Sequence, residues 1–188
     1  MCSPPVDLSF KNISRITGAV AEVPRCGVRP LTTDSIGRFL SRSLRLSNNR
    51  ISDITDLHYV LHHLMADPSQ LGWLDLSFNH ITYIDPVLRE LRELRVLYLH
   101  GNNIMEMSTV DKLGELPHLH TITLHGNAIE NTRGYRSHVI FALPHLKNMD
   151  FSVVTREERE LANFWHRSMK QNQKHKTASP APATSAFK

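Results

Sequence analysis

Hydrophobic residues recur through the middle of the chain in a fixed order, and an asparagine stands near the end of each copy. The order is L-x-x-L-x-L-x-x-N-x-L, where L is an aliphatic residue and x is any residue. It occurs four times, at residues 41–51, 71–81, 94–104 and 119–129, with Ser41 in the first aliphatic position of the first copy. The asparagines of the four copies are Asn49, Asn79, Asn102 and Asn127. A fifth, degenerate copy follows, with apolar positions at Leu146, Met149, Phe151 and Val154.

This spacing is typical of a leucine-rich-repeat solenoid. A single copy cannot bury its own apolar face, whereas stacked copies share one column of aliphatic side chains. The asparagine follows the strand, where its amide can pair with backbone groups that would otherwise be buried without partners. We therefore predict an α/β fold with a short parallel β-sheet on the concave face, a helical or irregular convex side, and structural roles for the four asparagines.

The residues outside the repeats predict how the solenoid is closed at its N-terminal end. Residues 1–40 contain separated prolines and scattered apolar residues. This pattern indicates an extended N-terminal cap anchored by Phe10 and Ile13, or alternatively a partner-binding arm. The repeats then span residues 41–154, and their first connection is longer than the others. Its apolar residues have helical spacing, at Leu57, Val60, Leu61 and Leu64, until Pro68 ends the predicted helix.

The C-terminal end predicts a helix followed by a tail. Thr155 and Glu158 form a capping box that opens a helix over residues 155–170. Its apolar stripe predicts a helical C-terminal cap packed on the last repeat. The stripe consists of Leu161, Phe164, Trp165 and Met169. Residues 171–188 are poor in apolar residues and predict a basic low-complexity tail.

The net charge of +4 comes from the C-terminal end of the chain. Residues 167–188 contain five lysines and arginines and no acidic residue, which leaves −1 for the other 166 residues. The basic composition therefore does not predict nucleic-acid binding. No window is apolar enough for a membrane span, no secretory signal is recognisable, and Cys2 and Cys26 lack metal-ligand spacing. We expect a cytoplasmic location.

No residues stand in a catalytic arrangement. The sequence has no nucleophile motif, its carboxylates are spread singly, and no glycine-rich loop joins a strand to a helix. His58 and His62 lie one helical turn apart, which two metal ligands can use, but no third ligand accompanies them. The sequence therefore predicts no enzyme activity, no cofactor and no metal site.

The residues between the core leucines of each strand are expected to point out of the concave face, because side chains alternate along a strand. Aromatic residues dominate many protein-binding surfaces, so those on this face and their polar neighbours are the candidate partner site. The candidates are Arg45, Trp73, Asp75, Phe78, Tyr98, His100, Thr123 and His125. His100 and His125 occupy equivalent positions, where they either meet an acidic partner or are ordinary surface residues. Alternatively, the N-terminal segment or the tail covers this face.

The repeats and the closing segment resemble the SDS22-like group of leucine-rich-repeat proteins, whose terminal cap motif is similar to residues 134–136, 143–146 and 154–159. Stretches outside the repeat pattern, among them residues 4–10, 24–31 and 84–88, resemble the leucine-rich repeat-containing protein 51 family, over residues 4–169. The resemblance implies a cytoplasmic adaptor. The SDS22-like group includes a leucine-rich light chain of axonemal dynein, a phosphatase-1 regulator, a spliceosomal protein and a tubulin-folding cofactor.

The repeats, the predicted concave face and the resemblance to these families together predict a non-enzymatic adaptor that is monomeric by itself. We expect it to bind a protein partner across the concave face, as a component of a ciliary or flagellar axonemal assembly. A cytoplasmic regulatory subunit of an enzyme such as a phosphatase is the alternative, and binding to an RNA particle is a third possibility. The leading hypothesis involves no membrane and no nucleic acid.

Overall fold

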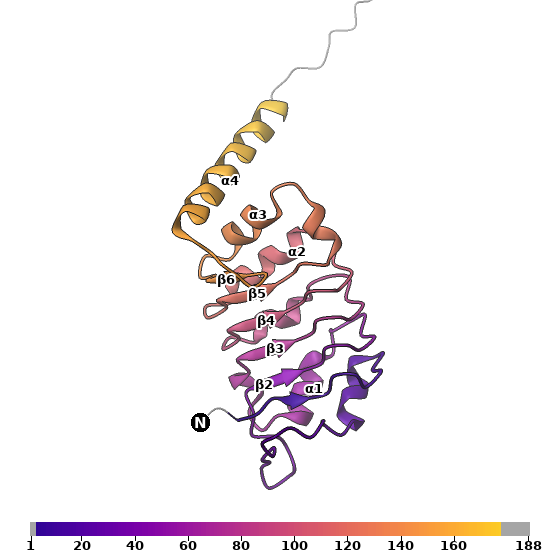
Figure 1. Ribbon diagram of the computed structural model, residues 1–188. Coiled ribbons are helices and arrows are strands. Elements are labelled where there is room, and N and C mark those ends of the chain that lie inside the picture. Colours follow the sequence, from indigo (N-terminus) through magenta and orange to yellow (C-terminus); the bar gives the residue numbers. More distant parts are fainter. Residues whose placement is uncertain (1–2, 178–188) are drawn as a thin grey trace, which may run out of the picture.

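The computed structural model describes residues 3–177 as a stack of coils that share one curved sheet (Figure 1). The strands follow one another across the sheet in sequence order; the first six run parallel, and the last is antiparallel to its neighbour. They are β1 (Val6–Asp7), β2 (Ser43–Arg45), β3 (Trp73–Asp75), β4 (Val96–Tyr98), β5 (Thr121–Thr123), β6 (Asn148–Met149) and β7 (Ser152–Val153). The predicted solenoid fold is confirmed.

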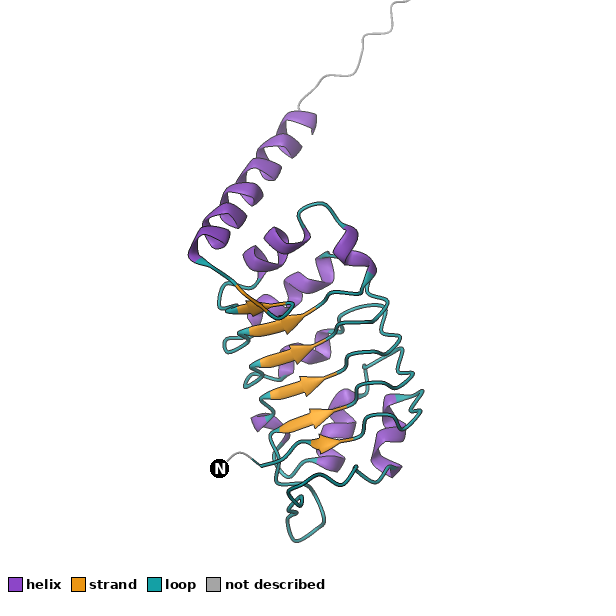
Figure 2. Ribbon diagram, viewed as in Figure 1, coloured by secondary structure: helices purple, strands orange, loops and turns teal. Residues whose placement is uncertain are grey.

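The convex side consists of short helices and loops, as Figure 2 shows. The α-helices are α1 (Leu57–Leu64), α2 (Ser108–Asp111), α3 (Tyr135–Ala142) and α4 (Arg156–Thr177). Short 3-10 helices also lie in the connections: η1 (Ile16–Ala21), η2 (Pro68–Gln70), η3 (Pro86–Glu90), η4 (Lys112–Glu115) and η5 (Ala128–Asn131). The helix predicted in the first connection is α1, whose apolar residues are buried and which ends before Pro68. No helix in the described residues is long and apolar enough to cross a membrane.

The core is a column of apolar side chains, one from each of the six parallel strands. The register of the sheet places Leu44, Leu74, Leu97 and Ile122 side by side, and all four have no exposed surface. Each such side chain contributes about 1.5 to 3 kcal/mol when it is buried. Because each coil covers the apolar face of the next, the coils stabilise one another.

The repeat asparagines join consecutive coils through their buried side-chain amides. Asn102 shows the arrangement: its Oδ1 accepts from the backbone N–H of Ile81 in the preceding coil at 3.0 Å. Its Nδ2 donates to the carbonyl oxygens of Leu76 and Leu99, also at 3.0 Å. The same bonds recur at Asn49, Asn79 and Asn127. Backbone groups that leave the strands are thereby paired inside the stack.

The N-terminal segment forms an additional coil that the repeat pattern did not reveal. β1 pairs with β2, and Val6, Leu8 and Ile13 are buried in the core positions of this coil. Lys11 stands where the repeat has its asparagine. Asn49 of the next coil pairs the backbone at this position, because its Oδ1 accepts from the N–H of Lys11 (3.0 Å) in addition to the ladder bond from the N–H of Ile13 (3.1 Å).

Phe10 corrects the prediction for this segment. We expected Phe10 and Ile13 to anchor an N-terminal cap, and Ile13 is buried, but Phe10 is 66% exposed. Its backbone turns with a φ of 59°, which directs the ring away from the core. The chain then returns along the free edge of β1, where the N–H of Arg25 donates to the carbonyl oxygen of Asp7 at 2.7 Å.

The C-terminal end is closed by α3 and α4, which pack together. The predicted capping box opens α4: Thr155 Oγ1 accepts from the N–H of Glu158 (3.2 Å), and Glu158 Oε2 accepts from the N–H of Thr155 (3.0 Å). Glu158 also binds Arg136 of α3 (2.7 Å), and this hydrogen bond lowers the pKa of Glu158. The ring of Trp165 lies so close to Gly134 that no Cβ fits there. Trp165 thus packs α4 onto the end of the solenoid.

α4 differs from the prediction in its length and its packing. It continues through residues 171–177, where the sequence predicted a tail, because these residues include no proline or glycine. Leu161, Phe164 and Met169 stay exposed, since the helix projects beyond the last coil and packs on α3 along one side (Figure 1). Residues 178–188 of the predicted tail lie outside the described residues.

Candidate functional site

The concave face carries a continuous group of aromatic rings contributed by successive coils. Trp73 of β3 and Tyr98 of β4 meet edge to face, with ring centroids 5.8 Å apart and an interplanar angle of 85°. His100 and His125 stack with centroids 4.8 Å apart and an angle of 9°, and Phe78 meets His100 edge-on at 5.0 Å. We name as the aromatic strip the residues Trp73, Phe78, Tyr98, His100, His125 and Phe151.

Phe151 enters this strip although the sequence assigned it to the core of the fifth copy. The backbone of Asp150 (φ 49°) and of Phe151 (φ 60°) turns sharply, so β7 folds back against β6 and the coil is not completed. Phe151 is consequently 67% exposed, and its centroid lies 5.8 Å from that of Tyr98 and 5.6 Å from those of His100 and His125. One feature of the sequence could have predicted that this coil is incomplete: Val154 stands at the position where the other copies have their asparagine.

Phe78 has a backbone conformation that glycine adopts readily and residues with a side chain adopt rarely. Its φ is 53°, in the left-handed region, and the equivalent positions of the next two coils are Gly101 (φ 67°) and Gly126 (φ 70°). A non-glycine residue there costs on the order of 1 to 3 kcal/mol. The ring of Phe78 is 53% exposed and covers Gly101, where a Cβ would lie only 2.7 Å from ring atom Cδ1.

Arg45 adds a positive charge beside the rings. Its guanidinium carbon lies 5.9 Å from the ring centroid of Trp73, a cation–π distance. The same group forms ion pairs with Asp75 (3.2 Å) and Asp7 (3.7 Å). This end of the strip is therefore polar and held by charges from three adjacent strands.

Asp75 and Thr123, which we expected to be exposed, are buried at 3% and 0% exposure. The carboxylate of Asp75 turns back to accept from the N–H and the Oγ of Ser77, at 3.0 and 2.6 Å, and Arg45 covers it. The Oγ1 of Thr123 lies 2.7 Å from Nδ1 of His100, so the imidazole covers it. Both residues contact side chains of the concave face, Arg45 and His100, and are themselves too buried to contact a partner.

The electrostatics of the histidine pair follow from its burial. Burial and the neighbouring His125 lower the pKa of His100, which favours its neutral form. Asp150 lies 3.2 Å from Nδ1 of His125 and also accepts from the backbone N–H groups of Leu124 (2.7 Å) and His125 (3.0 Å). Its other oxygen accepts from the hydroxyl of Tyr135 at 2.8 Å, and burial together with Asp150 raises the pKa of Tyr135. Asp150 thereby fixes the end of the strip.

The strip is open to solvent on the side away from the sheet. The N-terminal segment lies along β1 and packs against α1, and Phe78 and Phe151 remain more than half exposed. The alternative in which the tail covers the strip involves residues 178–188, which lie outside the described residues.

In the described part of the chain, no three histidine, cysteine or acidic side chains gather as a metal site requires. His58 and His62 pack ring to ring, 4.1 Å apart, and His58 lies 3.3 Å from Glu90.

Comparison with known sequences gives matches over most of the chain. The leucine-rich repeat family model matches residues 43–179. Leucine-rich repeat-containing protein 51 of Macaca mulatta is 47% identical over 164 residues, which are 87% of this chain and 85% of the relative. The human protein of the same name is 46% identical over the same shares. A probable U2 small nuclear ribonucleoprotein A' of Caenorhabditis elegans is 38% identical over 95 residues, 50% of this chain and 38% of that protein.

A solved structure shares the fold. A chain in the crystal structure of the Drosophila melanogaster SNF/U2A' complex is similar with a TM-score of 0.68, at 22% identity, over 93% of this chain and 88% of the other. At this identity the likeness extends to the fold alone.

Proposed function

Because the chain belongs to the leucine-rich repeat-containing protein 51 family, we propose that it is a non-enzymatic adaptor that binds a protein partner through its aromatic strip. Leucine-rich-repeat sheets present extended concave surfaces that suit protein binding. The strip combines the half-buried rings of Trp73 and Tyr98, the exposed rings of Phe78 and Phe151, and a flanking arginine, a composition that is enriched at the centres of protein interfaces.

Phe78 is the observation that carries the proposal. A large apolar side chain stands, more than half exposed, in a strained backbone position that glycine fills in the next two coils. Neither exposure nor strain stabilises the free protein, so contact with a partner is the reason we infer for this residue. Phe151, also exposed and at positive φ, lies at the other end of the strip and supports the same inference.

We further propose that the partner belongs to a ciliary or flagellar axonemal assembly and that the protein works in the cytoplasm of ciliated cells. The resemblance to the SDS22-like group, which includes an axonemal dynein light chain, supports this assignment. A regulatory subunit of a phosphatase differs from it in a measurable way, because such a subunit forms a soluble complex with the catalytic subunit.

The test uses the full chain, tagged and expressed in ciliated cells. A strip variant carries Trp73→Ala and Tyr98→Ala. The matched control carries Tyr59→Ala and His63→Ala, an aromatic pair on the convex helix α1 whose centroids lie 4.2 Å apart. Circular dichroism first verifies that both variants are folded, and isolated axonemes are then washed with salt.

We expect the wild type and the control to stay with the axonemes, while the strip variant is released. Retention of the strip variant would show that the concave face is not the binding surface. If the wild type itself stays soluble with a phosphatase catalytic subunit, the axonemal assignment fails, whereas loss of that complex in the strip variant supports the adaptor function.

A further inference from the structure

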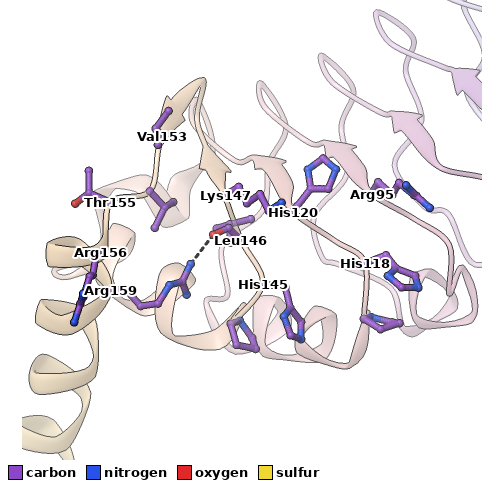
Figure 3. Close-up of a pocket in the computed structure, with 13 residues that line it drawn as sticks. Arg95, His118, His120, His145, Leu146, Lys147, Val153, Thr155, Arg156 and Arg159 are labelled. Carbon is purple, nitrogen blue, oxygen red and sulfur yellow. Dashed lines mark hydrogen bonds between the residues drawn. The ribbon is translucent and has the colours of Figure 1, made fainter.

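A second surface lies at the edge of the sheet where the parallel strands begin. Figure 3 shows a groove there, lined on one side by residues that directly precede the strands and on the other by the loop that leads into α4. Arg95, His120 and Lys147 immediately precede β4, β5 and β6. His118 and His145, two residues earlier in their coils, line the groove as well.

The register of the sheet brings two cations, Arg95 and Lys147, to either side of His120. Because Val96, Thr121 and Asn148 pair across the sheet, the residues before them stack in consecutive coils. Neighbouring strands lie about 4.8 Å apart, so the backbones that carry Arg95 and Lys147, two strands apart, are separated by roughly 10 Å. A smaller hollow shares Arg95 and His120 with the groove and extends it to Arg42, the residue before β2.

The groove has few negative charges to compensate its cations. No aspartate or glutamate is among its lining residues in the described part of the chain. Glu93 lies beside it, 3.6 Å from Arg95 and 3.7 Å from His118. Lys147 forms no ion pair with any described residue. Burial and the adjacent cations Lys147 and Arg95 lower the pKa of His120, as expected in a positive environment.

We propose that this cationic groove binds an acidic segment of a protein partner. Glutamates seven or eight residues apart on one face of a helix lie about 10.5 to 12 Å from each other along its axis, close to the separation of Arg95 and Lys147. The walls between the cations are apolar, formed by the exposed residues Pro117, Pro144 and Val153, and suit the aliphatic stems of glutamates. Single-stranded RNA is bound largely by aromatic stacking, and no phenylalanine, tyrosine or tryptophan lines the groove in the described residues.

The groove is distinct from the site of the proposed function, and the two are tested separately. The probe is a fluorescein-labelled helical peptide with glutamate at every fourth position of an alanine background. A second peptide has glutamine in place of each glutamate, and a labelled oligouridylate of the same charge represents RNA. Fluorescence anisotropy measures the binding of each probe to the full chain at low and at moderate salt.

The groove variant carries Arg95→Gln and Lys147→Gln, and both side chains are exposed. The control variant carries Arg50→Gln and Arg133→Gln, exposed residues outside the groove, so its net charge changes equally. Phe78→Asn alters the aromatic strip at the opposite ends of the strands. We expect the groove variant to bind the glutamate peptide at least about fivefold more weakly, with a smaller salt dependence, and the other two to bind it as the wild type does.

Three results overturn the proposal. In the first, the wild type does not bind the glutamate peptide. In the second, the groove and control variants bind this peptide equally more weakly than the wild type. In the third, the wild type binds the oligouridylate more tightly than the peptide, through the same two residues. The last result would assign the groove to RNA. Loss of axonemal retention in the strip variant with intact peptide binding would leave both surfaces assigned as proposed.

Discussion

Replacement of Asn102 by alanine tests the asparagine ladder that joins the coils. Asn102 is 5% exposed, and its amide forms one hydrogen bond to the N–H of Ile81 and two to the carbonyl oxygens of Leu76 and Leu99. Without it, both carbonyl oxygens keep one amide donor from another repeat asparagine. The buried N–H of Ile81 keeps no such partner from the ladder and bears most of the cost.

The loss of stability in Asn102→Ala can be worked out from these hydrogen bonds. A buried donor left without a partner costs about 1 to 3 kcal/mol, and each of the two lost bonds to a carbonyl contributes about 0.5 to 1.5 kcal/mol. The sum is a decrease of roughly 2 to 6 kcal/mol in the free energy of unfolding. Because small domains are stable by only about 5 to 15 kcal/mol, this is a large share of the total.

Urea denaturation followed by circular dichroism measures this loss. Asn103 is the matched control, because it is the next residue in the chain and its side chain is exposed. We expect Asn103→Ala to unfold at nearly the wild-type urea concentration and Asn102→Ala to unfold at a much lower one. If both variants unfold at the same concentration, the amide does not join the coils and the reasoning is refuted.

Three further predictions concern the core, the strip and the cap. Leu99→Ala opens a cavity in the aliphatic column and should lower the free energy of unfolding by roughly 2 to 5 kcal/mol, measured in urea; an unchanged midpoint would contradict the register. Phe78→Asn relieves the strain at positive φ, so the melting temperature should rise while partner retention falls, and a lower melting temperature would argue against strain. Glu158→Gln removes the ion pair with Arg136 and should lower the melting temperature at neutral pH. Since the pKa of Glu158 is lowered in the folded state, its contribution is lost as the pH falls through that value, and the difference from wild type should vanish in acid; a difference that persists there has another cause.

Local repetition explains how much of the fold the sequence predicted. The leucines and asparagines recur at fixed spacing, and each depends only on the adjacent coils, so one template placed both Leu97 and Asn102 correctly. The first coil was missed because Lys11 replaces its asparagine, and the backbone at Lys11 is paired by Asn49, 38 residues away. No pattern within residues 1–40 reveals a hydrogen bond that the next coil provides.

The candidate site was predicted in part for a related reason. Trp73 and Tyr98 were placed on the concave face because alternation along a strand puts such residues on one face of a sheet, and Phe78 was added because it lies near the end of the strand that carries Trp73. Alternation does not decide exposure, which depends on what neighbouring coils place over a side chain. Asp75 is covered by Arg45 and Thr123 by His100, so both are buried on the face where we expected exposed residues.

The sequence by itself determined the repeat, its aliphatic core, its asparagines and the capping box of α4, because these are short-range patterns with one stable geometry. The tertiary structure alone decided that Phe151 joins the aromatic strip, since two consecutive left-handed residues reverse the chain after β6. It also decided that Arg95, His120 and Lys147 form one groove, because residues about 25 positions apart become neighbours only when the coils stack in register. The surfaces we assign to partners are thus set by stacking, whereas the core that carries them is set by the repeat.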